Sequence, residues 1–125
     1  MEAGMRIQEN PHTASFTIFD ADKLDPVTVF LQDFGGGCGR MIVECWCTAW
    51  SAYWGAMGSA SVREFVLEAH PEYIATRMLP QDRKHLKRDE AYLLRIVKVV
   101  QQAMRDGAGK VAAAGVATDG GATNG

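Results

Sequence analysis

The sequence lacks the patterns that mark membrane-spanning, secreted and disulfide-stabilised proteins. No apolar run approaches the ~20 residues that a membrane helix needs, and the start, from Met1 to Arg6, lacks the charged-then-apolar layout of a signal peptide. Three cysteines cannot all pair, and Cys45 and Cys47 would begin at least ~6.5 Å apart on one strand. We therefore expect a soluble cytoplasmic protein with reduced thiols and no contact with a membrane.

The sequence also lacks the spacings of common metal, nucleotide and catalytic sites. No Cys-x-x-Cys or His-x-x-x-His pair is present, so we expect no metal and no cofactor. The glycine-rich stretch 35–39 lacks the Gly-Lys-Ser/Thr ending of a phosphate-binding loop, which favours a hairpin turn. Asp20, Asp22, Asp25 and Asp33 are typical of turns, although they resemble a magnesium cluster. An enzyme is not expected, and a hydrolase built on Cys or Asp stays an alternative.

The chain of 125 residues has the size of one domain. Residues 1–14 are polar and without periodicity, which predicts a flexible N-terminal arm. Glycine and alanine make up twelve of the last twenty residues, so 106–125 are predicted to be a disordered tail. The domain itself is expected to span 15–105.

Three segments of the first half show the composition of strands. They are 15–19, 27–32 and 40–47, and the last two flank the glycine-rich stretch, which predicts a central β-hairpin. The alternation of the third segment predicts that one set of its side chains faces the core: Met41, Val43, Cys45 and Cys47.

Helices are expected in the second half. Ser61 and Glu64 have the spacing of a capping box, which predicts a helix start, and 71–79 lies between two prolines as a second short helix. The last helix carries an apolar stripe, followed by Gly107 as its C-cap: Leu86, Leu93, Ile96, Val97, Val100 and Met104. The predicted fold is one α+β domain, with an antiparallel sheet of about three strands packed against two or three helices.

All three tryptophans of the chain fall between residues 46 and 58. Trp46, Trp50, Tyr53 and Trp54 recur with a helical rhythm, so we expect the third strand to give way to a helical turn around Ala49. Most of these aromatic side chains are expected in the core. Because tryptophan is rarely buried completely, Trp50, Tyr53 and Trp54 are also candidates for a binding surface.

Charge is distributed unevenly along the chain. Residues 1–76 carry four Lys/Arg and ten Asp/Glu, whereas residues 77–105 carry eight and three. At 100° per residue the cations of the last helix project to one side, opposite the apolar stripe. This predicted basic ridge is either a solvated helix face or a contact for nucleic-acid phosphates or an acidic protein. Its members are Lys84, Lys87, Arg88, Arg95, Lys98 and Arg105.

Several strings of the chain resemble a family of small proteins encoded by tailed bacteriophages and prophages. The most distinctive is Trp-Ser-Ala-Tyr-Trp-Gly-Ala-Met-Gly at 50–58, and others lie at 19–29, 39–43 and 90–97. The resemblance covers nearly all of the expected domain and carries no catalytic residue. It implies an accessory role during infection or lysogeny, in the cytoplasm of the bacterial host.

Two functions are therefore expected from the sequence. The first is a non-enzymatic protein that binds a host or phage protein in replication, recombination or counter-defence. The alternative is a nucleic-acid-binding module for DNA or RNA, in which the basic ridge meets phosphates and the aromatic residues stack on bases.

Overall fold

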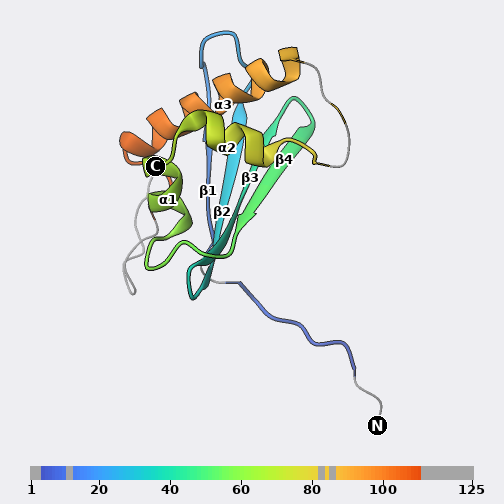
Figure 1. Ribbon diagram of the computed structural model, residues 1–125, viewed down its shortest axis with the longest axis vertical. Helices are drawn as coiled ribbons and strands as arrows, with labels where there is room; N and C mark the ends of the chain where they lie inside the picture. Colours follow the sequence, from blue (N-terminus) through green and yellow to red (C-terminus); the bar gives the residue numbers. More distant parts are fainter. Residues whose placement is uncertain (1–3, 11–12, 82–83, 85–86, 111–125) are drawn as a thin grey trace.

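The computed structural model describes residues 4–10, 13–81, 84 and 87–110. Four strands come first in this part of the chain, and three helices follow (Figure 1). The strands are β1 (Thr13–Ile18), β2 (Val27–Gly35), β3 (Cys38–Cys45) and β4 (Thr48–Trp54). The helices are α1 (Val62–Glu68), α2 (Pro71–Met78) and α3 (Lys87–Arg105). The α+β class is as the sequence predicts, with four strands where about three were expected.

The four strands form one antiparallel sheet in the order β1-β2-β3-β4, so each strand pairs with its neighbour in sequence. The predicted hairpin is confirmed, because β2 and β3 pair with Phe30 opposite Ile42. Gly36 and Gly37 turn the chain with φ of 65° and 80°, a conformation that costs glycine little.

The expected helical turn around Ala49 is wrong, because these residues form strand β4. Trp46, Trp50 and Trp54 are spaced by four, which suits one side of a helix and equally one face of a strand. The hydrogen bonds of β3 decide between them, since β4 pairs along its whole length with that strand. Trp50 and Trp54 consequently face the helices, and Tyr53 points to the opposite side.

Cys47 is not on the core face, so the prediction that it lies there with Met41, Val43 and Cys45 is wrong. The third strand ends at Cys45, and Trp46 and Cys47 are the two central residues of the turn to β4. Cys45 pairs with Thr48 across this turn, so the alternation of β3 stops at Cys45, its last core side chain. Met41, Val43 and Cys45 are buried as predicted, whereas Cys47 is exposed.

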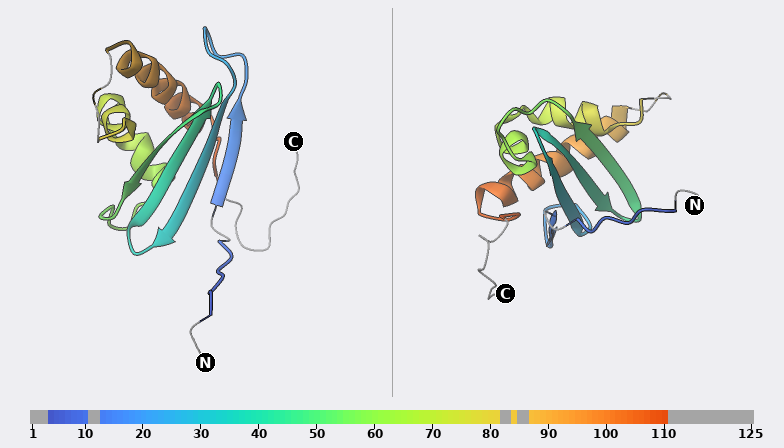
Figure 2. Two further views of the ribbon diagram at one scale, coloured as in Figure 1. Left: turned by 90° about the vertical axis from the view of Figure 1, so that its right-hand side faces the viewer. Right: turned by 90° about the horizontal axis from the view of Figure 1, so that it is seen from below.

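All three helices lie on one face of the sheet (Figure 2). The capping box that was predicted for α1 is present, because Ser61 Oγ accepts from the Glu64 N–H and the Glu64 carboxylate accepts from the Ser61 N–H. Asp33 at the end of β2 accepts from the Val62 N–H at 2.8 Å. This bond makes Asp33 part of the attachment of α1 to the sheet.

The core lies between the sheet and α3. The predicted stripe of α3 is buried from Leu93 to Met104, and Leu86 lies outside the described residues. It packs toward the inward side chains of β2 and β3, while α1 and α2 close the remaining edge. The most completely buried apolar side chains are Val27, Val29, Met41, Val43, Val62, Val66, Ile74, Leu93, Ile96, Val97, Val100 and Met104.

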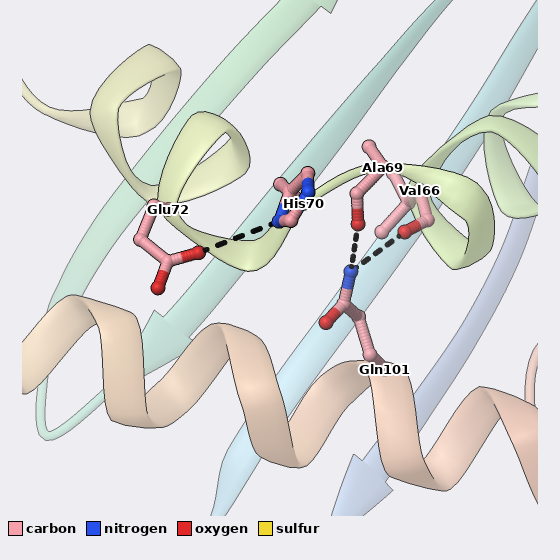
Figure 3. Close-up of polar contacts among 5 residues, drawn as sticks. All are labelled: Val66, Ala69, His70, Glu72 and Gln101. Carbon is pink, nitrogen blue, oxygen red and sulfur yellow. Dashed lines mark hydrogen bonds and ion pairs between the residues drawn. The ribbon is translucent and has the colours of Figure 1, made fainter.

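One polar side chain enters this core. Gln101 of α3 is only 2% exposed, and its amide donates to the carbonyls of Val66 and Ala69 at 2.9 and 2.8 Å (Figure 3). These carbonyls lie at the end of α1, where helical partners are missing. Gln101 therefore joins α3 to the connection between α1 and α2. The neighbouring pair of His70 and Glu72 is 3.9 Å apart and exposed, so it contributes little.

The far end of α3 is also held by a side chain. Arg63 of α1 donates to the carbonyls of Met104 and Ala108, and Gly107 takes the φ of 110° expected of a C-cap. Residues 106–110 therefore stay against the domain, and 111–125 of the predicted tail lie outside the described residues. At the other end, 4–10 are exposed and without regular structure. The flexibility predicted for both ends stays a prediction.

Candidate functional site

A groove of about 730 Å³ lies between the β3–β4 turn and the start of α3. Figure 1 shows the two elements at the same end of the molecule. A volume of this size is in the range of small-ligand sites. The residues that line the groove are Cys45, Trp46, Thr48, Trp50, Leu79, Pro80, Lys84, Arg88, Asp89, Tyr92 and Arg95.

Trp46 stands at the tip of the β3–β4 turn with 74% of its surface exposed. Trp46 and Cys47 both have positive φ, 53° and 62°, as the central residues of a type I′ turn require. Such turns favour Asn-Gly, because glycine has no Cβ and the short polar side chain of asparagine bonds locally, whereas other residues cost roughly 1–2 kcal/mol in the left-handed region. The turn is therefore less stable with Trp46-Cys47 than it would be with Asn-Gly. In exchange, this sequence places the large aromatic side chain of Trp46 in solvent.

The aromatic wall of the groove is formed by Trp50 and Tyr92. Their ring centroids are 6.0 Å apart at an interplanar angle of 60°, an edge-to-face contact. The Tyr92 hydroxyl lies 3.2 Å from the sulfur of Cys45. This hydrogen bond and burial raise the pKa of Tyr92 to about 12. The phenol is neutral at physiological pH with or without this rise, so it does not repel an anionic ligand.

Positive charge surrounds the same groove. Among the residues that the structure describes, Lys84, Arg88 and Arg95 line it together with one carboxylate, that of Asp89. Arg95 is near enough to Tyr92 to act against the rise of the pKa of that phenol. Within the part of the chain that the structure describes, none of the three cations is in an ion pair. The groove therefore presents flat apolar side chains and unneutralised positive charge to the same ligand.

The sequence matches the model of one protein family over most of its length. Residues 5–91 match the model of Phage_phiTE_072, described as a phage family. The chain belongs to this phage family. The resemblance of the aromatic strings to phage proteins is thereby confirmed. The search of curated proteins and the search of solved structures found no match.

The family match of this phage protein extends over the sheet, α1, α2 and the first residues of α3. It includes Trp46, Trp50, Lys84 and Arg88 and ends just before Tyr92. The family description names no activity, so the function has to be argued from the groove itself.

The structure brings together four of the eight site residues that the sequence predicts. Trp50, Lys84, Arg88 and Arg95 line the groove of the phage protein. Before folding, Trp50 and Arg95 are separated by most of the helical half of the chain. The return of α3 across the sheet places the start of the basic ridge beside the β3–β4 hairpin.

The other four predicted residues lie elsewhere. Trp54 is 5% exposed, donates to the Tyr73 hydroxyl at 3.1 Å and packs on Phe65, so it belongs to the core. Tyr53 is exposed on the face of the sheet without helices. Lys87 faces α2, and Lys98 lies beside the connection between α1 and α2. The basic ridge is therefore divided among three hollows of the surface.

Two residues of the groove were missed as site residues from the sequence. Trp46 was treated as a core candidate, and Tyr92 was not considered. A signal for Tyr92 was present, because it stands four residues after Arg88 and three before Arg95, which places the three side chains near one another on a helix. Trp46 could have been recognised as exposed only if the turn at 46–47 had been predicted, since a side chain at the tip of a two-residue hairpin points away from the core.

The glycine-rich stretch and the acidic residues, within the described part of the chain, take structural positions. The glycine-rich stretch forms the β2–β3 turn, and the Met57 N–H donates to the Gly37 carbonyl there. Among the residues that the structure describes, no group of three or more His, Cys, Asp or Glu is placed to hold a metal ion. In the same residues, no helix is long and apolar enough to cross a membrane.

Proposed function

We propose that this phage protein binds single-stranded nucleic acid in the groove between the β3–β4 turn and α3. One observation carries the proposal: Trp46, Trp50 and Tyr92 line the same groove as Lys84, Arg88 and Arg95. Bases stack on aromatic side chains, and phosphates are neutralised by lysine and arginine. The proposal assigns binding and no chemical step.

A single strand fits this arrangement better than a duplex. Bases inside a duplex are stacked on one another, so an exposed ring such as that of Trp46 has no free base to meet. In a single strand, each base that stacks on an aromatic side chain contributes about 1–3 kcal/mol.

The role of binding a host or phage protein, which the sequence predicts first, stays a prediction. An acidic protein would be attracted by Lys84, Arg88 and Arg95, but it would not require aromatic side chains beside them. The proximity of Trp46, Trp50 and Tyr92 to these cations therefore favours nucleic acid. Capture of a protein at the groove is an outcome of the test below.

The test measures the affinity for labelled single-stranded oligonucleotides by fluorescence anisotropy. Trp46→Ala and Arg88→Glu are expected to weaken binding at least tenfold, because each removes one of the two kinds of contact. Trp46 is exposed in a turn and Arg88 on the surface of α3, so neither change opens the core. The matched control is Lys98→Glu, which changes the charge of the same helix outside the groove and should leave the affinity nearly unchanged.

Salt dependence gives a second measurement. For single strands the slope of log K against log salt changes by about 0.7 for each phosphate contact. Arg88→Glu should lower this slope by that amount or more, whereas Trp46→Ala should reduce the affinity without changing the slope. Equal losses in Trp46→Ala, Arg88→Glu and the Lys98→Glu control would contradict the groove as the site.

A protein ligand would give a different result. If no oligonucleotide binds, while a photoreactive group at position 46 becomes crosslinked to one host or phage protein in the wild-type background and not in Arg88→Glu, the nucleic-acid proposal is wrong. The protein-binding prediction would then take its place.

A further inference from the structure

One face of the sheet carries no helix (Figure 2). Its residues stand in three rows that cross the strands, because outward positions pair with outward positions. The middle row is Ser15, Phe30, Ile42 and Ser51. The row toward the β2–β3 turn is Thr13, Gln32, Arg40 and Tyr53. The row toward the β3–β4 turn is Thr17, Thr28, Glu44 and Ala49.

Three aromatic side chains of this face are partly exposed to solvent. Phe30, Phe34 and Tyr53 are between 36% and 49% exposed. The rings of Phe34 and Tyr53 are 6.2 Å apart, and the guanidinium of Arg40 lies 5.3 Å from the centre of the Phe34 ring. The Arg40 side chain is therefore held against the face by a cation–π contact. Exposed aromatic side chains that lie together, as Phe34 and Tyr53 do, mark contact surfaces.

The two outer rows differ in a complementary way. Arg40 and Glu44 flank Ile42 on the same strand and carry opposite charges. Next to Arg40 stands the large side chain of Tyr53, whereas next to Glu44 stands Ala49, which is small. The end of the face at Arg40 is thus positively charged and carries a large side chain. The end at Glu44 is negatively charged and carries a small one.

We propose that a second copy of this chain covers this face. The two sheets would pack face to face about a two-fold axis that crosses the strands at the row of Phe30 and Ile42. Such a rotation reverses the strand direction and keeps β3 opposite β3. Arg40 then faces the partner subunit's Glu44, and Tyr53 faces the partner subunit's Ala49. The middle row meets itself, as an isologous interface requires.

A two-fold axis along the strands would not use these features. It would keep each row opposite the same row, so that Arg40 faced the partner subunit's Gln32 and Glu44 faced the partner subunit's Thr28. Both charges would lose water without gaining a counter-charge. The positions of Arg40 and Glu44 therefore favour the axis across the strands.

The size of the face indicates a weak dimer. Four strands at ~4.8 Å spacing and about 20 Å length make a face of roughly 400 Å², below the ~800 Å² per partner of a standard stable interface. We therefore expect dimerisation that depends on protein concentration. The face lies on the side of the sheet away from the helices, so the dimer is independent of the proposed nucleic-acid site.

Sedimentation velocity over a hundredfold range of protein concentration tests the dimer. Arg40→Glu sets two carboxylates against each other across the interface, and Glu44→Arg sets two guanidinium groups against each other. Each variant alone should therefore dimerise about tenfold less tightly than the wild type. In an equimolar mixture of the two variants, each carboxylate of one subunit can face a guanidinium of the other. The mixture should recover the association of the wild type.

The mixture makes the experiment independent of folding defects, because a variant that had lost its fold would not regain association. The matched control is Glu68→Arg, the same change of charge on the exposed surface of α1, which should dimerise like the wild type. A monomeric wild type at every concentration would overturn the proposal, and so would a mixture that associates no better than the single variants. If Arg40→Glu weakened only oligonucleotide binding, the face would belong to nucleic acid instead.

Discussion

The hydroxyl of Tyr92 and the sulfur of Cys45 lie 3.2 Å apart, and they connect α3 to the last residue of β3. Cys45 Sγ also lies 3.6 Å from the Asp25 carbonyl, before β2. Trp50 rests with its ring edge-to-face against Tyr92. The Tyr92–Cys45 hydrogen bond between α3 and the sheet therefore orients the aromatic wall of the groove. The same hydrogen bond should make the free energy of unfolding depend on pH.

The stability of the protein should fall at alkaline pH through Tyr92. Its pKa is raised from 10.0 to about 12 by the hydrogen bond to Cys45 and by burial. The folded state therefore holds this proton more tightly than the unfolded state. This stabilisation is complete below pH 10 and is lost as the pH rises through about 12.

Tyr92→Phe isolates that contribution. The difference in the free energy of unfolding between wild type and variant, from urea titrations, should be constant below pH 10 and shrink between pH 10 and 12. The slope should be at most about 1.4 kcal/mol per pH unit, which corresponds to one proton. A difference that stays constant throughout this window would contradict the pKa assigned to Tyr92.

Gln101→Leu should lower the free energy of unfolding by about 1–3 kcal/mol. The substitution has a similar volume, but it leaves the Val66 and Ala69 carbonyls without the amide that bonds them. The matched control is Gln102→Leu, one position along, where the side chain is exposed and donates only to Asp106. Equal stabilities of the two variants, measured by urea unfolding, would show that the buried amide contributes nothing.

Replacement of Trp46-Cys47 by Asn-Gly should separate stability from binding. It should raise the free energy of unfolding by about 1–2 kcal/mol, because these residues adopt the positive φ of this turn at lower cost. The same variant should bind oligonucleotides at least tenfold more weakly, since it lacks the exposed ring. Cys47→Gly alone is the control: it should be more stable and bind as the wild type does. Unchanged binding by the double variant would exclude Trp46 from the site.

Arg63→Ala should loosen the end of α3. Its guanidinium donates to the carbonyls of Met104 and Ala108, where α3 ends, and the Met104 carbonyl also accepts from the Gly107 N–H. Amide hydrogen exchange should become faster at 105–110 and stay the same at the centre of α3. Arg105→Ala removes a neighbouring exposed cation that bonds only Gln102, and it should leave this exchange unchanged.

Much of the architecture could be read from local patterns. The β2–β3 hairpin, the capping box at Ser61 and the stripe from Leu93 to Met104 each depend on residues close together in the chain. Periodicity and turn chemistry determine such elements directly. The segment 46–54 was misjudged for the same reason, because a spacing of four fits a helix and a strand alike. Only the hydrogen bonds to β3 distinguish them.

The sequence by itself determined the α+β class, the start of α1, the end of α3, the basic character of α3 and the phage family, since each is written in neighbouring residues. It could not show that Trp46 and Trp50 meet Arg88 and Arg95, or that Tyr53 and Trp54 take opposite faces. Those outcomes depend on the path of α3 back across the sheet and on the pairing of β4 with β3. They are contacts between segments that are distant in the sequence, and such contacts stabilise the protein only once the chain has folded and brought those segments together.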